Sequence, residues 1–269
     1  MKMIIFDLIG KFASFKKFYS NSSSMSYIFP PRTTIEGIIA SIMGYDFDSY
    51  YEEFNFQNSL ISVSLKSKIR TYIGTLNYIK IINSTTYKNN MLKKKGYEYT
   101  QIPFEMILPE NFSKNIVFRI YFKSEDSIML ELEEKIKNKK PVYPISLGNA
   151  NMLANINFIA NAEITPITLE NQFIKVISPT PLKYINDIQM LEDIHIQKDI
   201  FPVSFDENRY PKTMEYVFER EGKEYKIKTD KTVLSINYHD DVLPSNIYTE
   251  YIDLENCSPL RSMRKIEPI

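Results

Sequence analysis

The chain has 269 residues, of which 43% are hydrophobic and 25% are charged, a composition typical of a globular protein with a substantial buried core. Its 33 basic residues balance its 33 acidic residues, and this zero net charge argues against a free-standing, non-specific nucleic-acid binder. The sequence has neither a membrane-length apolar run nor a signal-peptide pattern, and its single cysteine, Cys257, excludes an intrachain disulfide, so we expect a cytoplasmic protein with no membrane contact.

The first predicted elements are a buried strand over residues 3–8 and a helix over residues 33–44. The helix has an apolar stripe at the spacing of one buried face, and Thr33 and Glu36 have the spacing of a capping box. Arg32 comes directly before this helix, where free amides and the helix dipole favour an anion. We therefore predict that Arg32 and Thr33 bind phosphate.

Basic and aromatic residues alternate between the first strand and this helix. Lysines neutralise phosphates, and exposed aromatic rings stack on unpaired bases. Tyr27 is therefore a candidate stacking residue, whereas Phe12 and Phe15 are expected to lie in the core. The candidate phosphate-binding lysines of this segment are Lys11, Lys16 and Lys17.

A long strand is predicted over residues 60–72, because apolar and polar residues alternate there. Lys66, Lys68 and Arg70 lie two residues apart and therefore on one face of that strand. The segment that follows is rich in Asn, Tyr and Lys, and we predict an extended hairpin or an insertion. Because residues 66–100 contain eight basic residues and one acidic residue, this region is either polarised for an anion or a solvated loop.

Further strands are predicted over residues 102–108, 116–122 and 156–167, and a further helix over residues 124–138. The resulting order of strand, helix, strand, strand, helix, strand is the ferredoxin-like βαββαβ unit, which RNA-recognition modules share. The predicted fold class is α+β, with a ferredoxin-like (RRM-like) domain over residues 1–170, an inserted β-hairpin over about residues 74–100, and a small β-rich C-terminal region over residues 171–269.

Several kinds of catalytic site lack their sequence motifs. There is no glycine-rich phosphate loop and no His-Glu-x-x-His pair, and a lone cysteine excludes a zinc ribbon. His195 and His239 are the only histidines, and no nucleophile elbow accompanies them. We therefore predict no metal site and no cofactor, and the residues disfavour a Ser-His-Asp or Cys-His hydrolase.

The opening strand, the turn at Gly10, residues 27–31 and residues 33–44 together resemble one family. This family is the CRISPR-associated Cascade subunit that caps the 5′ handle of the guide RNA, the "Cas-five" subunit of the repeat-associated mysterious protein (RAMP) superfamily. Residues 141–150 resemble its Pro-x-Tyr-Pro…Leu-Gly segment, and residues 201–209 resemble its C-terminal Pro…Phe-Asp…Arg segment. The chain looks most like the type I-B branch.

The resemblance implies a ferredoxin-like fold with a protruding β-hairpin "thumb" and a role in antiviral defence. It also implies contact with the CRISPR RNA 5′ handle, the Cascade backbone subunit and the large PAM-reading subunit, and indirect contact with the target DNA duplex. The residues expected to bind the handle are Lys11, Lys16, Lys17, Tyr27, Arg32, Thr33, Lys66, Lys68, Arg70 and Arg209. The thumb residues expected to contact the guide–target backbone without reading sequence are Lys88, Lys93, Lys94 and Lys95.

Two other functions remain open at this point. One branch of the family cleaves precursor RNA with Tyr, Lys and His, but this chain has no histidine before His195. We therefore favour a non-catalytic subunit, with a metal-independent endoribonuclease that uses Lys95 and a nearby tyrosine as the alternative. The third possibility is a purely structural protein whose basic segment meets an acidic protein.

Overall fold

The centre of the protein is a six-stranded antiparallel sheet with the strand order β16-β15-β8-β1-β7-β4. The computed structural model describes residues 2–79, 81, 83–92, 99–206, 208–238 and 241–244. The strands of the central sheet are β1 (Lys2–Gly10), β4 (Leu60–Leu65), β7 (Ile116–Lys123), β8 (Ala154–Thr168), β15 (Thr232–Ile236) and β16 (Val242–Pro244). The strands predicted over residues 3–8, 116–122 and 156–167 are thus confirmed.

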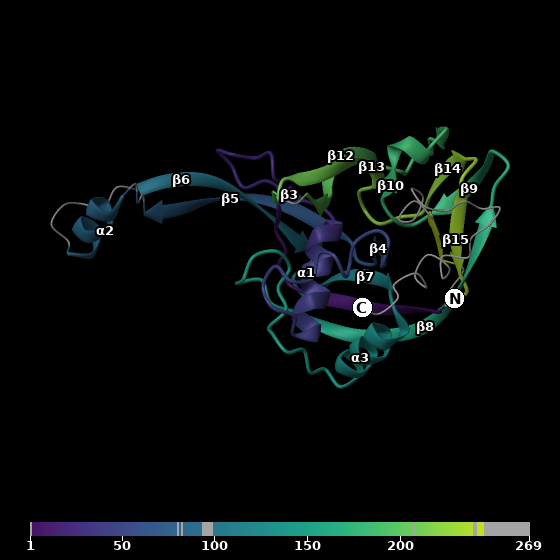
Figure 1. The fold of residues 1–269 in the computed structure, drawn as a ribbon. Helices are drawn as coiled ribbons and strands as arrows, with labels where there is room; N and C mark the ends of the chain where they lie inside the picture. Colours follow the sequence, from purple (N-terminus) through teal and green to yellow (C-terminus); the bar gives the residue numbers. More distant parts are fainter. Residues whose placement is uncertain are drawn as a thin grey trace.

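Two helices, α1 (Arg32–Met43) and α3 (Asp126–Lys137), cover one face of this sheet (Figure 1). Their apolar stripes, which include Ile35, Ile39 and Leu132, join the strand side chains Phe6 and Phe118 in one buried core. Both predicted helices are therefore confirmed, because their apolar residues recur at the helical period and can all face the sheet at once.

The predicted capping box of α1 is wrong. The helix begins one residue earlier than predicted, so Pro31 occupies the N-cap and no side chain caps the first turn. The Glu36 carboxylate turns instead toward Arg32, one helical turn away. At the other end the helix stops at Gly44, close to the predicted boundary, because Gly44 has a positive φ of 91° and its amide donates to the Ala40 carbonyl.

The chain enters the central sheet in a simple order. Helix α1 connects β1 to β4, and α3 connects β7 to β8. Strand β1 pairs with both β7 and β8, while β4 pairs with the outer edge of β7. The protein is therefore a mixed α+β fold in which both helical connections lie on the same face of an antiparallel sheet.

A long hairpin projects from this body (Figure 1). Strands β5 (Ile69–Ile79) and β6 (Tyr99–Pro109) pair over their full length of 11 residues, and the short helix α2 (Ser84–Met91) lies beyond them. The strand predicted over residues 60–72 is broken between β4 and β5, where the Ser67 hydroxyl accepts a hydrogen bond from the Val117 amide. The hairpin therefore begins at residue 69 rather than near residue 74.

The region after residue 170 is rich in short strands, as predicted. Because β15 pairs with β8, this region is continuous with the central sheet, and the division of the chain near residue 170 stays a prediction. None of the helices in the described part of the chain is long and apolar enough to cross a membrane. The remaining elements are β2 (Phe15–Lys16), β3 (Ser26–Tyr27), β9 (Gln172–Val176), β10 (Thr180–Pro181), η1 (Leu182–Tyr184), β11 (Asp187–Gln189), β12 (Ile196–Phe205), β13 (Pro211–Glu219) and β14 (Tyr225–Thr229).

Candidate nucleic-acid interface

Cations and exposed aromatic rings gather where the β5–β6 hairpin leaves the body. They come from three segments: the turn after β1, the start of β5 and its approach, and the loop between β6 and β7. These segments meet because β1 pairs with β7 and β5 pairs with β6. We call this surface the hairpin-base patch; its residues are Lys11, Phe12, Lys68, Arg70, Phe112 and Lys114.

The turn after β1 is fixed to the loop between β6 and β7. The Lys11 ammonium donates to the carbonyls of Phe112 and Lys114 at 2.8 and 2.6 Å. The rings of Phe12 and Phe112 lie 6.4 Å apart, and they are 41% and 55% exposed. The prediction that Phe12 lies in the core is therefore wrong, whereas Phe15 is buried as predicted.

Two lysines of the patch approach one carboxylate, and its arginine lies over an aromatic ring. The Arg70 guanidinium lies over the Phe112 ring, 5.3 Å from its centroid. Lys68 and Lys114 both approach the Glu110 carboxylate, at 3.9 and 3.8 Å, and all three of these side chains are at least half exposed. Exposed pairs of this kind contribute little stability, so the lysines remain available to an external anion.

Lys66 does not join the patch. Its ammonium lies 3.5 Å from the Asp241 carboxylate, which also accepts a hydrogen bond from the buried Tyr121 hydroxyl at 2.7 Å. Sequence spacing placed Lys66 on the same face as Lys68 and Arg70, but that inference assumed one continuous strand. The break between β4 and β5 separates them.

The basic and aromatic residues before α1 are mostly engaged within the protein. Lys17 forms an ion pair of 2.6 Å with Asp199, and the Tyr19 hydroxyl donates to the same carboxylate at 2.7 Å. Tyr27 is fully buried, and its ring stacks on Phe201 with centroids 4.5 Å apart. This placement leaves Tyr27 no face for a base.

The Tyr27 hydroxyl is occupied as well, because it donates to the Ile200 carbonyl at 2.7 Å. Burial, followed by the nearby charges of Tyr19 and Asp199, raises the pKa of Tyr27. Of the three lysines predicted here, Lys16 is exposed on β2 and Lys11 belongs to the hairpin-base patch.

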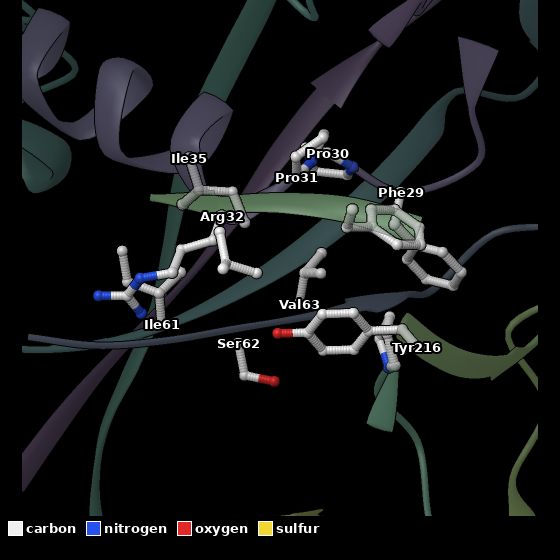
Figure 2. A pocket seen from close by; sticks show the side chains of 12 residues that line it. Phe29, Pro30, Pro31, Arg32, Ile35, Ile61, Ser62, Val63 and Tyr216 are labelled. Atoms are coloured by element: carbon white, nitrogen blue, oxygen red, sulfur yellow. The ribbon is translucent and has the colours of Figure 1, made fainter. Parts of the chain in front are cut away.

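Arg32 lies in the interior rather than at a phosphate-binding surface. Figure 2 shows it among apolar side chains that include Ile35 and Ile61, at the edge of a small pocket of about 50 Å³. Its guanidinium donates to the Phe54 carbonyl at 2.7 Å and to the Ser59 hydroxyl at 2.8 Å. The predicted phosphate contact of Arg32 has no support in this geometry.

The Arg32 guanidinium also forms an ion pair of 2.9 Å with Glu36, and both side chains are almost fully buried. Burial raises the pKa of Glu36 to about 7, although the charge and hydrogen bond of Arg32 act in the opposite direction. The pair therefore anchors the first turn of α1 to the loop around residues 54–59. Thr33, the neighbouring candidate, is partly exposed.

Arg209 lies at the turn of the β12–β13 hairpin, on the wall of an open hollow of about 620 Å³. Its guanidinium forms an ion pair with Asp48, donates to the Asp48 carboxylate at 2.7 Å, and lies over the Tyr51 ring. This contact lowers the pKa of Asp48. Arg209 is half exposed but is separate from the hairpin-base patch.

The remaining predicted residues belong to the tip of the long hairpin. Lys88 is exposed on α2, whereas Lys93, Lys94 and Lys95 lie outside the described residues. The hairpin stalk itself carries no charged residue over positions 71–79 and 99–104. Within the described residues, no group of three or more His, Cys, Asp or Glu side chains is placed to hold a metal ion.

Sequence reasoning missed Phe112 and Lys114. They occur in a polar loop, Asn-Phe-Ser-Lys, and nothing in its composition separates it from an ordinary solvated turn. Their signal is spatial: strand pairing brings this loop beside the turn that carries Lys11 and Phe12. A large aromatic residue in a short polar loop is the one sequence feature that could have indicated them.

Comparison with known proteins gives two kinds of match. A family model described as CRISPR-associated protein (Cas_Cas5) matches residues 3–199, and no curated protein matches the chain. A solved CRISPR protein from Archaeoglobus fulgidus has 12% identity and a TM-score of 0.52, over 90% of this chain and 98% of that chain. A chain of a CRISPR RNA-guided surveillance complex has 10% identity and a TM-score of 0.44, over 84% of this chain and 91% of that chain. At 12% identity the likeness to the Archaeoglobus fulgidus protein concerns the fold alone.

Proposed function

This chain belongs to the CRISPR-associated Cas5 family, and from that premise we propose that it is a non-catalytic subunit that binds the 5′ handle of CRISPR RNA in a type I interference (Cascade) complex. The observation that carries the proposal is the hairpin-base patch, which combines four cations with two exposed aromatic rings. Surfaces that hold single-stranded RNA have this combination, because cations follow the backbone while rings stack on bases.

Each residue of the patch has a role in this proposal. Lys68, Arg70 and Lys114 neutralise handle phosphates, and Glu110 holds the two lysines in place until RNA replaces it. Phe12 and Phe112 offer ring faces to unpaired bases. Lys11 fixes the loop that carries Phe112 and keeps its charge beside the bound backbone.

We also propose that the β8-β1-β7-β4 part of the sheet, with α1 and α3 on one face, is the ferredoxin-like unit of the RAMP superfamily. The β5–β6 hairpin is then the thumb. Its stalk is uncharged and exposes Tyr72, Ile73 and Tyr78, which suits contact with the backbone subunit better than contact with phosphates. Lys88 at the tip would approach the guide–target duplex.

The assembly follows from the same proposal. The protein would contact the first backbone subunit and the large PAM-reading subunit of a cytoplasmic complex for antiviral defence, with type I-B as the proposed subtype. Its balanced charge of 33 basic and 33 acidic residues fits a subunit whose surface meets proteins as well as RNA.

The test is a gel shift of the purified protein with labelled CRISPR repeat RNA and with a shuffled RNA of equal length. It is run with EDTA and at two salt concentrations, and both band mobility and fragment length are read. We expect an uncleaved repeat RNA complex that weakens as salt rises and is tighter than the shuffled complex. Cleaved RNA would establish the endoribonuclease alternative. Equal affinity for both RNAs would refute handle recognition.

A further inference from the structure

A second sheet in the C-terminal region has two chemically different faces. It contains β11, β14 and β9 in that order, with β14 in the centre. Successive side chains of β14 point to opposite faces, so Tyr225 and Ile227 are buried in a small apolar core while Lys226 and Lys228 lie on the other face. We call this second surface the outer face of the sheet.

The strand register concentrates positive charge on the outer face. Lys226 lies directly opposite Lys175 of β9, and Lys228 lies opposite Phe173. Two like charges at directly opposed positions destabilise a sheet. Glu224 offsets part of that cost, because its carboxylate lies 3.2 Å from Lys175, but both side chains are more than half exposed. The pairing of Lys175 with Lys226 therefore does not stabilise the fold, which points to another role for these lysines.

The outer face also carries an exposed aromatic ring. Phe173 is 44% exposed, and the Lys228 ammonium lies over the ring at 5.8 Å from its centroid. On the other side of β14, Asp187 lies opposite Lys228 and Gln189 lies opposite Lys226. The outer face thus carries three lysines, one aromatic ring and one amide, and its two carboxylates are those of Asp187 and Glu224.

We propose that the outer face, built around Lys175, Lys226, Lys228 and Phe173, is a second nucleic-acid site that binds a single-stranded polynucleotide. The lysines neutralise consecutive phosphates, and Phe173 stacks on one base. An acidic protein would satisfy the lysines equally well, but on β9 and β14 Phe173 is a single ring beside lysines rather than part of an apolar surface such as that of the long hairpin, which suits stacking on a base better than packing against a protein. The ring therefore favours a strand with unpaired bases.

This site is distinct from the hairpin-base patch. Figure 1 places β9 and β14 at the end of the molecule opposite to the α2 tip of the long hairpin. Net charge conceals it, because residues 183–269 contain 12 basic and 17 acidic residues. In the folded protein the basic residues of this region are not spread evenly, because the alternation of side chains along β14 puts Lys226 and Lys228 on the same face. RNA and DNA single strands share the required chemistry, so the test includes both.

The test measures binding of labelled oligo(dT) and oligo(U), each about 20 nucleotides long, by fluorescence anisotropy. The full-length chain carries Arg70→Gln and Phe112→Leu, so that the hairpin-base patch does not mask the second site. The test variant adds Lys175→Gln, Lys226→Gln and Lys228→Gln. The matched control removes the same charge elsewhere, by Lys135→Gln, Lys140→Gln and Lys198→Gln. Thermal melting verifies that each variant is folded.

We expect the test variant to lose at least about tenfold in affinity, and its salt slope to fall by about 2, because a single-stranded contact contributes about 0.7 per phosphate. The control should stay within about twofold. Phe173→Leu alone should weaken binding about fivefold. If the test variant loses affinity for only one of the two oligonucleotides, that result identifies whether the outer face binds DNA or RNA.

Two results would overturn the proposal. Equal losses in the test variant and the control would show that binding follows net charge rather than this face. If Phe173→Leu has no effect and poly-glutamate displaces the oligonucleotide from the face at equal charge concentration, the face recognises acidic protein instead.

Discussion

Arg32 and Glu36, one turn apart on α1, form a 2.9 Å ion pair in which both side chains are less than 10% exposed. The pair is embedded further by hydrogen bonds from the same guanidinium to the Phe54 carbonyl and the Ser59 hydroxyl. The arginine that precedes the helix therefore fastens α1 to the following loop. This arrangement assigns Arg32 to folding stability rather than to RNA binding.

At pH 8, where Glu36 is ionised, replacing Arg32 by Ala should destabilise the protein by about 3–5 kcal/mol, because it leaves the buried Glu36 carboxylate without its cation. Urea unfolding measures this change. Arg209→Ala is the matched control, since its ion pair with Asp48 is exposed to solvent and should contribute little to the free energy of unfolding. Equal destabilisation by the two changes would contradict the structural role of Arg32.

The Glu36 carboxyl should make stability depend on pH. Its pKa in the folded protein is raised to about 7, above the ordinary 4.5, so the folded state keeps a proton that the unfolded chain releases. The free energy of unfolding should therefore fall as pH rises from about 4.5 to about 7, by roughly 3 kcal/mol for this group. Urea unfolding of the wild type and Glu36→Gln over this range isolates the effect. As pH rises from about 4.5 to about 7, the wild type should lose stability relative to Glu36→Gln, which has no carboxyl at this position to titrate. Parallel pH profiles of the two proteins would refute the role of Glu36.

Helices and strands could be predicted from the sequence more reliably than the contacts between distant residues. The helices and central strands could be recognised because apolar residues such as Ile35, Ile39 and Phe118 recur with the period of the element that buries them. The burial of Arg32 could not be recognised, since it depends on a loop that folds over the helix start. Lys17 and Asp199 are 182 residues apart, and no local pattern reveals such a pair.

The candidate site shows the same division. Lys11, Lys68 and Arg70 were identified from their charge and their spacing in the sequence, and strand pairing brings them together. Phe112 was missed because its loop has an ordinary composition, and Lys66 was included because the strand break was not visible in the alternation. The residue types in the sequence thus indicate which side chains can bind RNA, whereas the folded structure is needed to tell which of them lie next to one another.

Gly148 should be intolerant of a side chain. Its φ is 91°, and a Cβ built there would lie 2.0 Å from the Ser14 carbonyl oxygen. Gly148→Ala should therefore cost well over about 1 kcal/mol of stability. Gly74→Ala is the control, because φ is not positive there and the nearest atom belongs to the movable ring of Tyr72, at 3.1 Å. Urea unfolding compares the two variants. Equal stability of Gly148→Ala and Gly74→Ala would contradict the tight contact between Gly148 and the Ser14 carbonyl.

Phe112→Leu and Arg70→Gln should each weaken binding of CRISPR repeat RNA by about fivefold or more, because one removes a stacking surface and the other a phosphate partner. Arg70→Gln should also lower the salt slope by about 0.7, whereas Phe112→Leu should leave the slope unchanged. Anisotropy titrations at several salt concentrations give both quantities. The matched control is Phe47→Leu, which alters a ring that is 90% exposed outside the patch.

The pattern of slopes is what distinguishes a built site from a general electrostatic attraction. If the hairpin-base patch holds RNA, loss of the Phe112 ring must weaken affinity at every salt concentration, and Phe47→Leu must not. A loss confined to low salt for Arg70→Gln, with no effect of Phe112→Leu, would mean that the cations attract RNA without ordering it there. The handle would then have to bind elsewhere on the protein.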